Sequence, residues 1–324
     1  MVRALLDRLE PQIRKAFQEA FERHAARIDA RALIAALEAQ DIERAIRVLR
    51  IDTSLLFPLD EAIRNAFITG GTTAVTELPR GIAGLFAFNG RHPRAERWIR
   101  ENVGDKIQGI VEEQIETTRA VVLNGLQEQR GATAVAREIT GRMVGRKRFG
   151  GYLGLTSEQA DSIMRGRAKL ASGDPALMRE YLRLKLRNKR HDGKIKAAVK
   201  AGRPIRGREL DRIMEDHRSK ALGYRGRVIA RNEAHVALAA GRNEFYEQSL
   251  DNPEVETVKV RWQHNLSQEP REDHRAMDGK VIDLGEAFDF PDAEMRHPHD
   301  PAGGAKHSIN CRCVAVYRVK MRRD

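Results

Sequence analysis

Apolar residues recur every three or four positions through most of the first 250 residues, which is the spacing of amphipathic helices. The first such stretch covers residues 2–28, and Pro11 is expected to kink it or to begin a second helix. A later helix that begins near Pro58 is expected to end at Gly70 and Gly71. The pattern therefore predicts a series of helices in the N-terminal part of the chain.

Residues 78–93 are rich in glycine and proline, and we expect them to form a loop. The loop carries Leu85, Phe86 and Phe88, which would either form an exposed docking patch or pack onto the core beneath them. A long helical pattern then runs from Pro93 to about Gln129. Further helical patterns follow it as far as residue 250.

The period changes to two after residue 253, which predicts strands. The segment VRWQH and the preceding residues alternate, with apolar side chains on one face of a strand, namely Val258, Val260 and Trp262. A short strand is expected in VIDL, and a last one in NCRCVAVYRVK. In that last strand Cys311 and Cys313 would point to the same side, because side chains two residues apart share a face.

These patterns predict a mainly α protein, with an elongated helical body and a small C-terminal α+β domain that is rich in strands. A chain of 324 residues is long enough for several cores. We expect an N-terminal helical interaction arm over residues 1–130, a basic helical region over 131–250, and a C-terminal domain over 251–324.

The positive charge is concentrated in the middle of the chain. The net charge is +12, but residues 137–231 alone hold 26 Lys and Arg against 10 Asp and Glu, which leaves the rest of the chain at about −4. Such a block favours contact with a polyanion, although a cationic helical face in water remains the alternative. Aromatic residues do not alternate with the basic ones, so contact with DNA would involve phosphates and no base stacking. The candidate contacts are Arg183, Lys185, Arg187, Lys189, Arg190, Lys194 and Lys196.

Several functional classes are disfavoured by the sequence. No apolar stretch approaches the roughly 20 residues of a membrane span, and the first residues lack the apolar core of a signal peptide. Nucleotide-binding and zincin motifs are absent. Two cysteines without a leader favour a reducing compartment.

The tail combines both cysteines with half of the ten histidines. Cys311 and Cys313 could bind Zn²⁺ together with two of the histidines, since zinc prefers sulfur and imidazole ligands. The candidates are His264, His274, His297, His299 and His307, with His274 and His297 the first choice. The Cys-x-Cys spacing is weaker evidence than Cys-x2-Cys. The alternative is two small buried thiols beside histidines that bind backbone groups. We therefore expect either no cofactor or a zinc ion.

The tail also contains the ingredients of a His-Asn-His metal nuclease, in EDHRAMDG, HPHD and SINCRC. Asp273 and His274 would then hold a divalent ion that stabilises phosphate charge. Those nucleases need a helix after the hairpin to supply the last ligand, whereas a strand-like segment follows Cys313. We therefore expect no enzymatic activity, with the nuclease as the alternative.

In combination, these motifs resemble the C-terminal domain of phage minor head proteins, the Mu F-like head morphogenesis family. The resemblance covers about residues 220–318, including an upstream helix in RGRVIARNEAHVALAAGRNEFYE, where Asn232 replaces the usual Thr. The matching positions are His274, Met277, Asp278, Gly279, Lys280, Phe288, Pro298, Asn310, Cys311, Arg312 and Cys313.

The resemblance implies a low-copy, non-catalytic capsid component inside the virion head near the portal, assembled in the host cytoplasm and free of membrane in the folded head. Its implied partners are the portal protein, a major capsid or scaffold protein, and packaged double-stranded DNA bound without sequence preference. A non-specific DNA-binding protein without a capsid role remains a second alternative. The motif positions Asp278, Gly279, Lys280, Asn310 and Arg312 would be structural, with Asp278-Gly279 in a tight turn. Arg312 would either pair with Asp278 or Asp273 or stay solvated.

Overall fold

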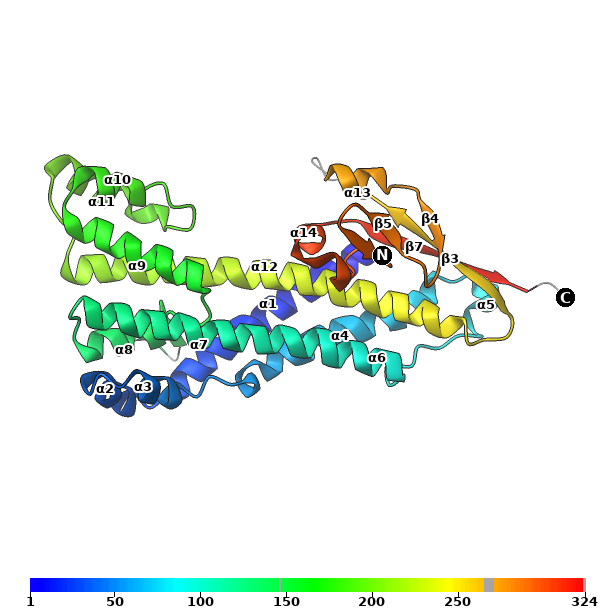
Figure 1. Ribbon diagram of the computed structural model, residues 1–324, viewed down its shortest axis with the longest axis horizontal. Coiled ribbons are helices and arrows are strands. Elements are labelled where there is room, and N and C mark those ends of the chain that lie inside the picture. The colour runs from blue at the N-terminus through cyan, green and yellow to red at the C-terminus, as the bar shows by residue number, and fades with distance from the viewer. Residues whose placement is uncertain (146, 265–270, 323–324) are drawn as a thin grey trace. The chain divides into compact units, whose positions relative to one another are not determined.

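A computed structural model describes residues 1–145, 147–264 and 271–322 (Figure 1). The protein is mainly helical with small antiparallel sheets, most of them near the C-terminus, as the periodicity predicts. It divides into two compact units that are interleaved along the chain, whereas the sequence suggests three consecutive regions. Unit 1 comprises residues 1–14, 59–106 and 228–324, and unit 2 comprises residues 15–58 and 107–227.

Unit 1 contains the C-terminal strands and the helices packed against them. Its elements are most of α4 (Phe57–Ala74), η2 (Val75–Glu77), α5 (Arg80–Ala83), α6 (Pro93–Trp98), η3 (Ile99–Val103), β3 (Val255–Gln263), α13 (Glu272–Ala276), β4 (Val281–Asp283), β5 (Phe288–Phe290), β6 (Ala293–Met295), η5 (Pro301–Gly303), α14 (Gly304–Ser308) and β7 (Val314–Met321). The helices α1 (Val2–Arg27) and α12 (Gly207–Ser249) each contribute residues to both units.

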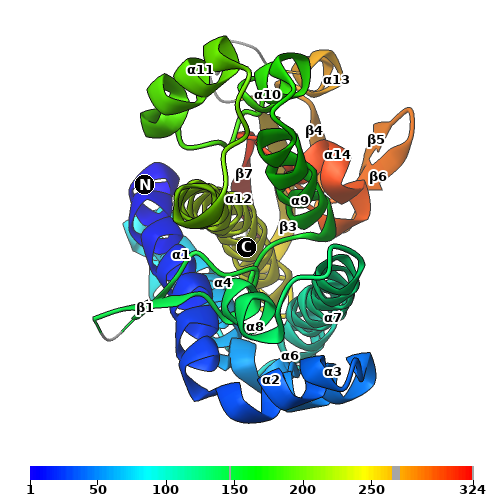
Figure 2. The same ribbon diagram turned by 90° about the vertical axis from the view of Figure 1, so that its left-hand side faces the viewer.

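Unit 2 is helical apart from one hairpin. Its elements are α2 (Ala30–Glu38), α3 (Ile42–Leu49), η1 (Thr53–Leu56), most of α7 (Gly104–Gln127), α8 (Ala132–Thr140), β1 (Arg142–Val144), β2 (Lys147–Phe149), α9 (Ser157–Ser172), α10 (Pro175–Tyr181), η4 (Lys189–His191) and α11 (Asp192–Ala201). Figure 2 shows α9 beside α12 in this unit, where Arg167 on α9 binds Asp211 on α12 at 3.0 Å.

Two glycines bring α4 and α12 into backbone contact within unit 1. A Cβ atom on Gly70 would lie 2.4 Å from the carbonyl oxygen of Leu238, and one on Gly241 would lie 1.9 Å from that of Phe67. The prediction that the helix ends at Gly70 and Gly71 is therefore wrong. The helix continues to Ala74. Gly70 serves the close crossing, whereas a Cβ atom on Gly71 would lie 2.4 Å from the ring of Phe88.

The C-terminal sheet has the strand order β4-β3-β7, and every pairing is antiparallel. Val258, Val260 and Trp262 are buried along β3, which confirms the predicted strand and its inner face. One end of this face packs on α12, where Tyr246 stacks on Tyr317 of β7 at 4.1 Å. Figure 1 shows β3 and β7 beside the yellow part of α12. The other end of the face forms a core around Trp262 with strands β5 and β6.

The structure decides three local points, two of which the sequence leaves open between alternatives. Helix α1 runs through Pro11, so no second helix begins there. The loop after residue 78 contains the short helix α5, and it packs on its own core, because Phe88 contacts Phe67 at 6.1 Å and Phe86 contacts Phe245 at 6.5 Å. The β1–β2 hairpin was not foreseen. Within the described ranges, no helix is long and apolar enough to cross a membrane.

Candidate metal centre

Three sulfur and nitrogen donors meet in the C-terminal core. The Sγ atom of Cys311 lies 3.4 Å from Nδ1 of His274, and Sγ of Cys313 lies 3.5 Å from the same nitrogen. All three ligand atoms are within 4.8 Å of one another, and all three residues are buried. Two thiols and one imidazole are donors that Zn²⁺ prefers, so this set fits a zinc ion by its chemistry and its spacing.

A hydrogen-bonded chain sets the orientation of the His274 ring. Nε2 of His307 lies 3.1 Å from the Asp292 carboxylate, which can only accept, so this nitrogen carries the proton. In the neutral imidazole, Nδ1 of His307 is then the acceptor, and Nε2 of His274 donates to it over 3.0 Å. The lone pair of His274 Nδ1 is left facing the two sulfurs. A ligating histidine is held in this way by the groups behind it.

The Asp292 carboxylate at the end of this chain is ionised. Its hydrogen bond with the Lys306 ammonium, and then that with His307, lower the pKa of Asp292 below its ordinary value. The carboxylate therefore keeps its acceptor role at neutral pH, and this stabilises the assigned ring tautomers.

The two thiols are coupled to each other. Both are unoxidised, and the hydrogen bond between them lowers the pKa of the Cys311 thiol and raises that of Cys313. The predicted strand begins later than expected, since β7 starts at Val314 and both cysteines precede it. They still point to one side, because Cys311 and Cys313 are buried and Arg312 between them is exposed.

The H-x-x-M-D-G-K motif shapes the frame that carries His274. Its ring packs edge-on against Trp262, with centroids 5.5 Å apart. The Asp278 carboxylate accepts from the backbone N–H of His264 at 2.7 Å. Gly279 donates its N–H to the carbonyl of Trp262 from a backbone φ of +81°, a conformation that favours glycine. The motif thus joins α13 to the sheet.

The remaining structural positions are simpler. Lys280 is exposed, and its carbonyl accepts from the backbone N–H of Trp262 at 3.0 Å. Asn310 adopts a φ of +60°, which asparagine tolerates better than most residues. Arg312 forms no ion pair with any residue that the structure describes, so the solvated alternative applies and not the pairing with Asp278 or Asp273.

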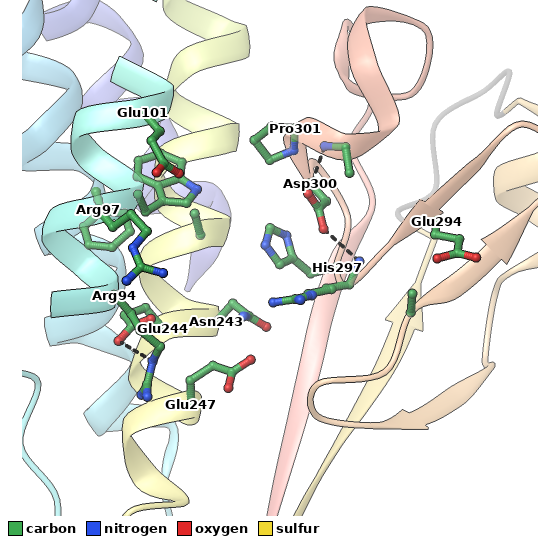
Figure 3. Close-up of a pocket in the computed structure, with 16 residues that line it drawn as sticks. Arg94, Arg97, Glu101, Asn243, Glu244, Glu247, Glu294, His297, Asp300 and Pro301 are labelled. Atoms are coloured by element: carbon green, nitrogen blue, oxygen red, sulfur yellow. Dashed lines mark hydrogen bonds and ion pairs between the residues drawn. The ribbon is translucent and has the colours of Figure 1, made fainter. Parts of the chain in front are cut away.

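His297 does not join the cluster of thiols. Its Nδ1 donates to the carbonyl of Pro298 at 2.9 Å, and the ring lines a separate pocket of about 490 Å³ in unit 1. Figure 3 shows His297 and Asp300 on one side of this pocket, across from Arg97 on α6. The structure instead brings His307 against His274, and His307 lies 33 residues further along the chain.

The seven candidate DNA contacts lie in unit 2, five of them between α10 and α11 and two, Lys194 and Lys196, within α11. They fall into two groups. Three are engaged with carboxylates: Arg187 with Asp192 at 2.8 Å, Arg190 with Asp216 at 2.5 Å, and Lys194 with Glu209 at 3.8 Å. The other four are exposed and form no ion pair within residues 1–145, 147–264 and 271–322: Arg183, Lys185, Lys189 and Lys196.

Comparison with known proteins gives one family. Residues 192–316 match the family described as Phage Mu protein F like protein. An uncharacterized protein, YqbB of Bacillus subtilis (strain 168), is 35% identical over 92 residues, or 28% of this chain and 29% of its own length. Minor head protein GP7 of Bacillus phage SPP1 is 30% identical over 95 residues, or 29% of this chain and 30% of its own length.

The chain therefore spans about three tenths of the length of these relatives. No solved structure is significantly similar to it. The family match covers α11, α12 and the C-terminal strands as far as β7, and it includes His274, Cys311 and Cys313. The similarity to the family described as Phage Mu protein F like protein thus covers residues 192–316, about two fifths of this chain.

Proposed function

We propose that this protein is a non-catalytic minor component of a phage head that aids head assembly and genome packaging. It lies inside the virion, is assembled in the host cytoplasm, and contacts the portal protein and packaged DNA, with the major capsid or scaffold protein as a further partner. The family match over residues 192–316 is the observation that carries this proposal. One matched relative is itself named a minor head protein.

The distribution of charge supports a role at DNA. Unit 2 holds 34 Lys and Arg against 21 Asp and Glu, a net charge of +13, whereas unit 1 has 24 against 25, a net charge of −1. The entire positive excess of the protein therefore belongs to one unit. A surface of this kind attracts a polyanion through released counterions, without reading its sequence.

The burial of His274 argues against the nuclease alternative. Its side chain is only 2% exposed, and it is enclosed by Trp262, Phe290 and the two cysteines. A phosphodiester could not reach it without opening this core. The strand β7 follows the cysteines, and no ligand-bearing helix follows Cys313 among the residues described. This arrangement supports a structural role for the site.

Assembly can be tested with the head proteins of the phage that encodes this chain. We expect the tagged chain to co-sediment with procapsids when portal and major capsid proteins are co-expressed, and to be lost when portal is omitted. The chain carrying His274→Ala tests the catalytic alternative on plasmid DNA with Mg²⁺ or Mn²⁺. Absence of the chain from particles, or nicking that His274→Ala abolishes, would contradict the proposal.

We further propose that Cys311, Cys313 and His274 hold a Zn²⁺ ion that crosslinks α13 to the segment before β7. Protein purified without chelator should contain about one equivalent of zinc by elemental analysis, because these donors are preorganised by the His307–Asp292 chain. Cys311→Ser with Cys313→Ser should remove the metal, since serine is a poor zinc ligand.

His297→Ala provides the matched control for zinc binding, because His297 is also a buried tail histidine but lies at the other pocket. It should retain the full equivalent of zinc. Less than a tenth of an equivalent in the unaltered protein would rule out the metal site. Equal loss in both variants would show that the ligands are wrongly assigned.

A further inference from the structure

Four arginines converge on one pocket in unit 2, and none of them is among the seven candidate DNA contacts. The pocket has a volume of about 540 Å³ and is lined by Arg137, Arg142, Arg208, Asp211, Arg212 and Glu215. These residues come from α8, β1 and the first turns of α12. Two of the four arginines, Arg137 and Arg142, lie outside the part of the chain that matches the family.

Both carboxylates in the pocket are already neutralised. Glu215 is 5% exposed and binds Arg137 at 2.8 Å and Arg142 at 3.0 Å. Asp211 binds Arg167 of α9 at 3.0 Å. Neither carboxylate is therefore left to repel an incoming anion.

The Glu215 pairs also fix where two guanidinium groups lie. Gly150 follows β2 and packs directly on Glu215, since a Cβ atom there would lie 2.8 Å from the Glu215 Cα atom. Its φ of +74° likewise favours glycine. The base of the hairpin is thus held against α12, and Arg142 is presented at the pocket in a set orientation. A preorganised guanidinium loses less entropy when it binds a ligand.

Arg208 and Arg212 supply the unneutralised charge. They are one turn apart on α12, so they lie on the same face of the helix. Both are exposed, and neither forms an ion pair in the part of the chain that the structure describes. Their planar donor forks match the oxygen geometry of a phosphate group.

The adjoining hairpin extends this basic surface. Strands β1 and β2 carry Arg142, Lys147 and Arg148 and no acidic residue, although Lys147 pairs with Glu22 at 3.2 Å. Met143 and Val144 of β1 are 47% and 49% exposed. Figure 2 shows β1 at the edge of the helices of its unit. A two-stranded ribbon is narrow enough to lie along the groove of a nucleic-acid duplex.

We propose that this pocket binds backbone phosphates of double-stranded nucleic acid, with the β1–β2 hairpin lying alongside the strand. The inference rests on the proposed contact with packaged DNA and gives that contact a built site. A built site differs from diffuse electrostatic attraction, because Arg208 and Arg212 then contribute more to the DNA affinity than other exposed arginines of the unit.

Binding of a 24-bp mixed-sequence duplex, followed by fluorescence anisotropy, tests the proposal. Arg208→Ala with Arg212→Ala should weaken binding about 10-fold or more in 0.1 M salt, because two phosphate contacts are lost. The slope of log K against log salt should become shallower by about 1.8. The matched control is Arg44→Ala with Arg47→Ala, two exposed arginines of α3 in the same unit, which removes the same charge and should weaken binding less than about 3-fold.

Each other outcome overturns the proposal in a distinct way. Equal weakening by both pairs would mean diffuse attraction without a phosphate pocket. Equal loss of poly-L-glutamate binding by the pocket pair would identify an acidic protein as the ligand. Absence of duplex binding by the unaltered protein would contradict both the phosphate pocket and the proposed contact with DNA. Failure of the proposed role in the head would instead appear as absence of the chain from particles. Circular dichroism checks that both pairs remain folded.

Discussion

Gly241→Ala should lower the free energy of unfolding by about 3 kcal/mol, the upper end of the usual cost of overpacking. The added methyl group would lie 1.9 Å from the carbonyl oxygen of Phe67, and its nearest neighbours are backbone atoms of α4. Backbone atoms cannot rotate away as a flexible side chain does, so α4 and α12 must separate. Urea unfolding followed by circular dichroism measures the change.

Gly223→Ala is the matched control, since Gly223 lies on the same helix. There the nearest atom to an added Cβ is the end of the Arg227 side chain, at 3.7 Å. Alanine is favoured over glycine within a helix by up to about 1 kcal/mol, so this variant should be as stable as the unaltered protein or more so. If Gly241→Ala unfolds at the same urea concentration as Gly223→Ala, the close crossing of α4 and α12 does not exist in solution.

Two glycines of α4, close to Gly241 in this crossing, show where sequence patterns fail. Gly70 and Gly71 look like a helix end, because glycine both terminates helices and permits close packing. Only the partner helix decides between these roles, and the contacting residue Leu238 of α12 lies 168 positions after Gly70. In contrast, the capping box of α9 at Thr156 and Gln159 was predictable, since its signal is local.

The candidate metal centre was predictable only in part. The clustering of Cys311, Cys313 and His274 is visible in the sequence, and the structure brings these three together. The sequence could not show whether His297 or His307 lies beside His274, because this depends on how α14 folds back toward α13. No sequence signal indicated Asp292, which is joined to the site through its hydrogen bond with His307.

The arginine pocket was missed for a related reason. Its residues are separated by up to 78 positions, and they belong to two stretches that were assigned to helices. The hairpin between those stretches has strands of three residues each, too short for alternation to be recognised. The net charge indicated the region. Only the ion pairs that Glu215 and Asp211 form with other arginines show which arginines remain free to bind a phosphate.

Acidification from pH 6.5 to 4.5 should reduce the free energy of unfolding by up to about 5 kcal/mol through two buried histidines. Burial lowers the pKa of His217 to about 4 and that of His235 to about 3, and neighbouring positive charges lower both further. The unfolded chain takes up a proton at each histidine near pH 6.5, whereas the folded protein does not. The stabilisation is therefore complete above pH 6.5 and is lost as the pH falls toward the folded-state values. Urea midpoints measured at half-unit steps of pH report the loss.

The variants His217→Gln and His235→Gln isolate the contribution of each histidine to the pH dependence of stability, because glutamine does not titrate. The carboxylates also titrate in this range, but they are the same in both variants and in the unaltered protein. Each variant should be less stable than the unaltered protein at pH 7, since Tyr181 contacts His217 at 3.3 Å and the ring of His235 packs on that of His299 at 4.6 Å. The deficit should shrink by up to about 1.4 kcal/mol per unit of pH below 6.5. Stability curves that stay parallel from pH 7 to 4.5 would show that these two histidines are protonated equally in the folded and unfolded chain.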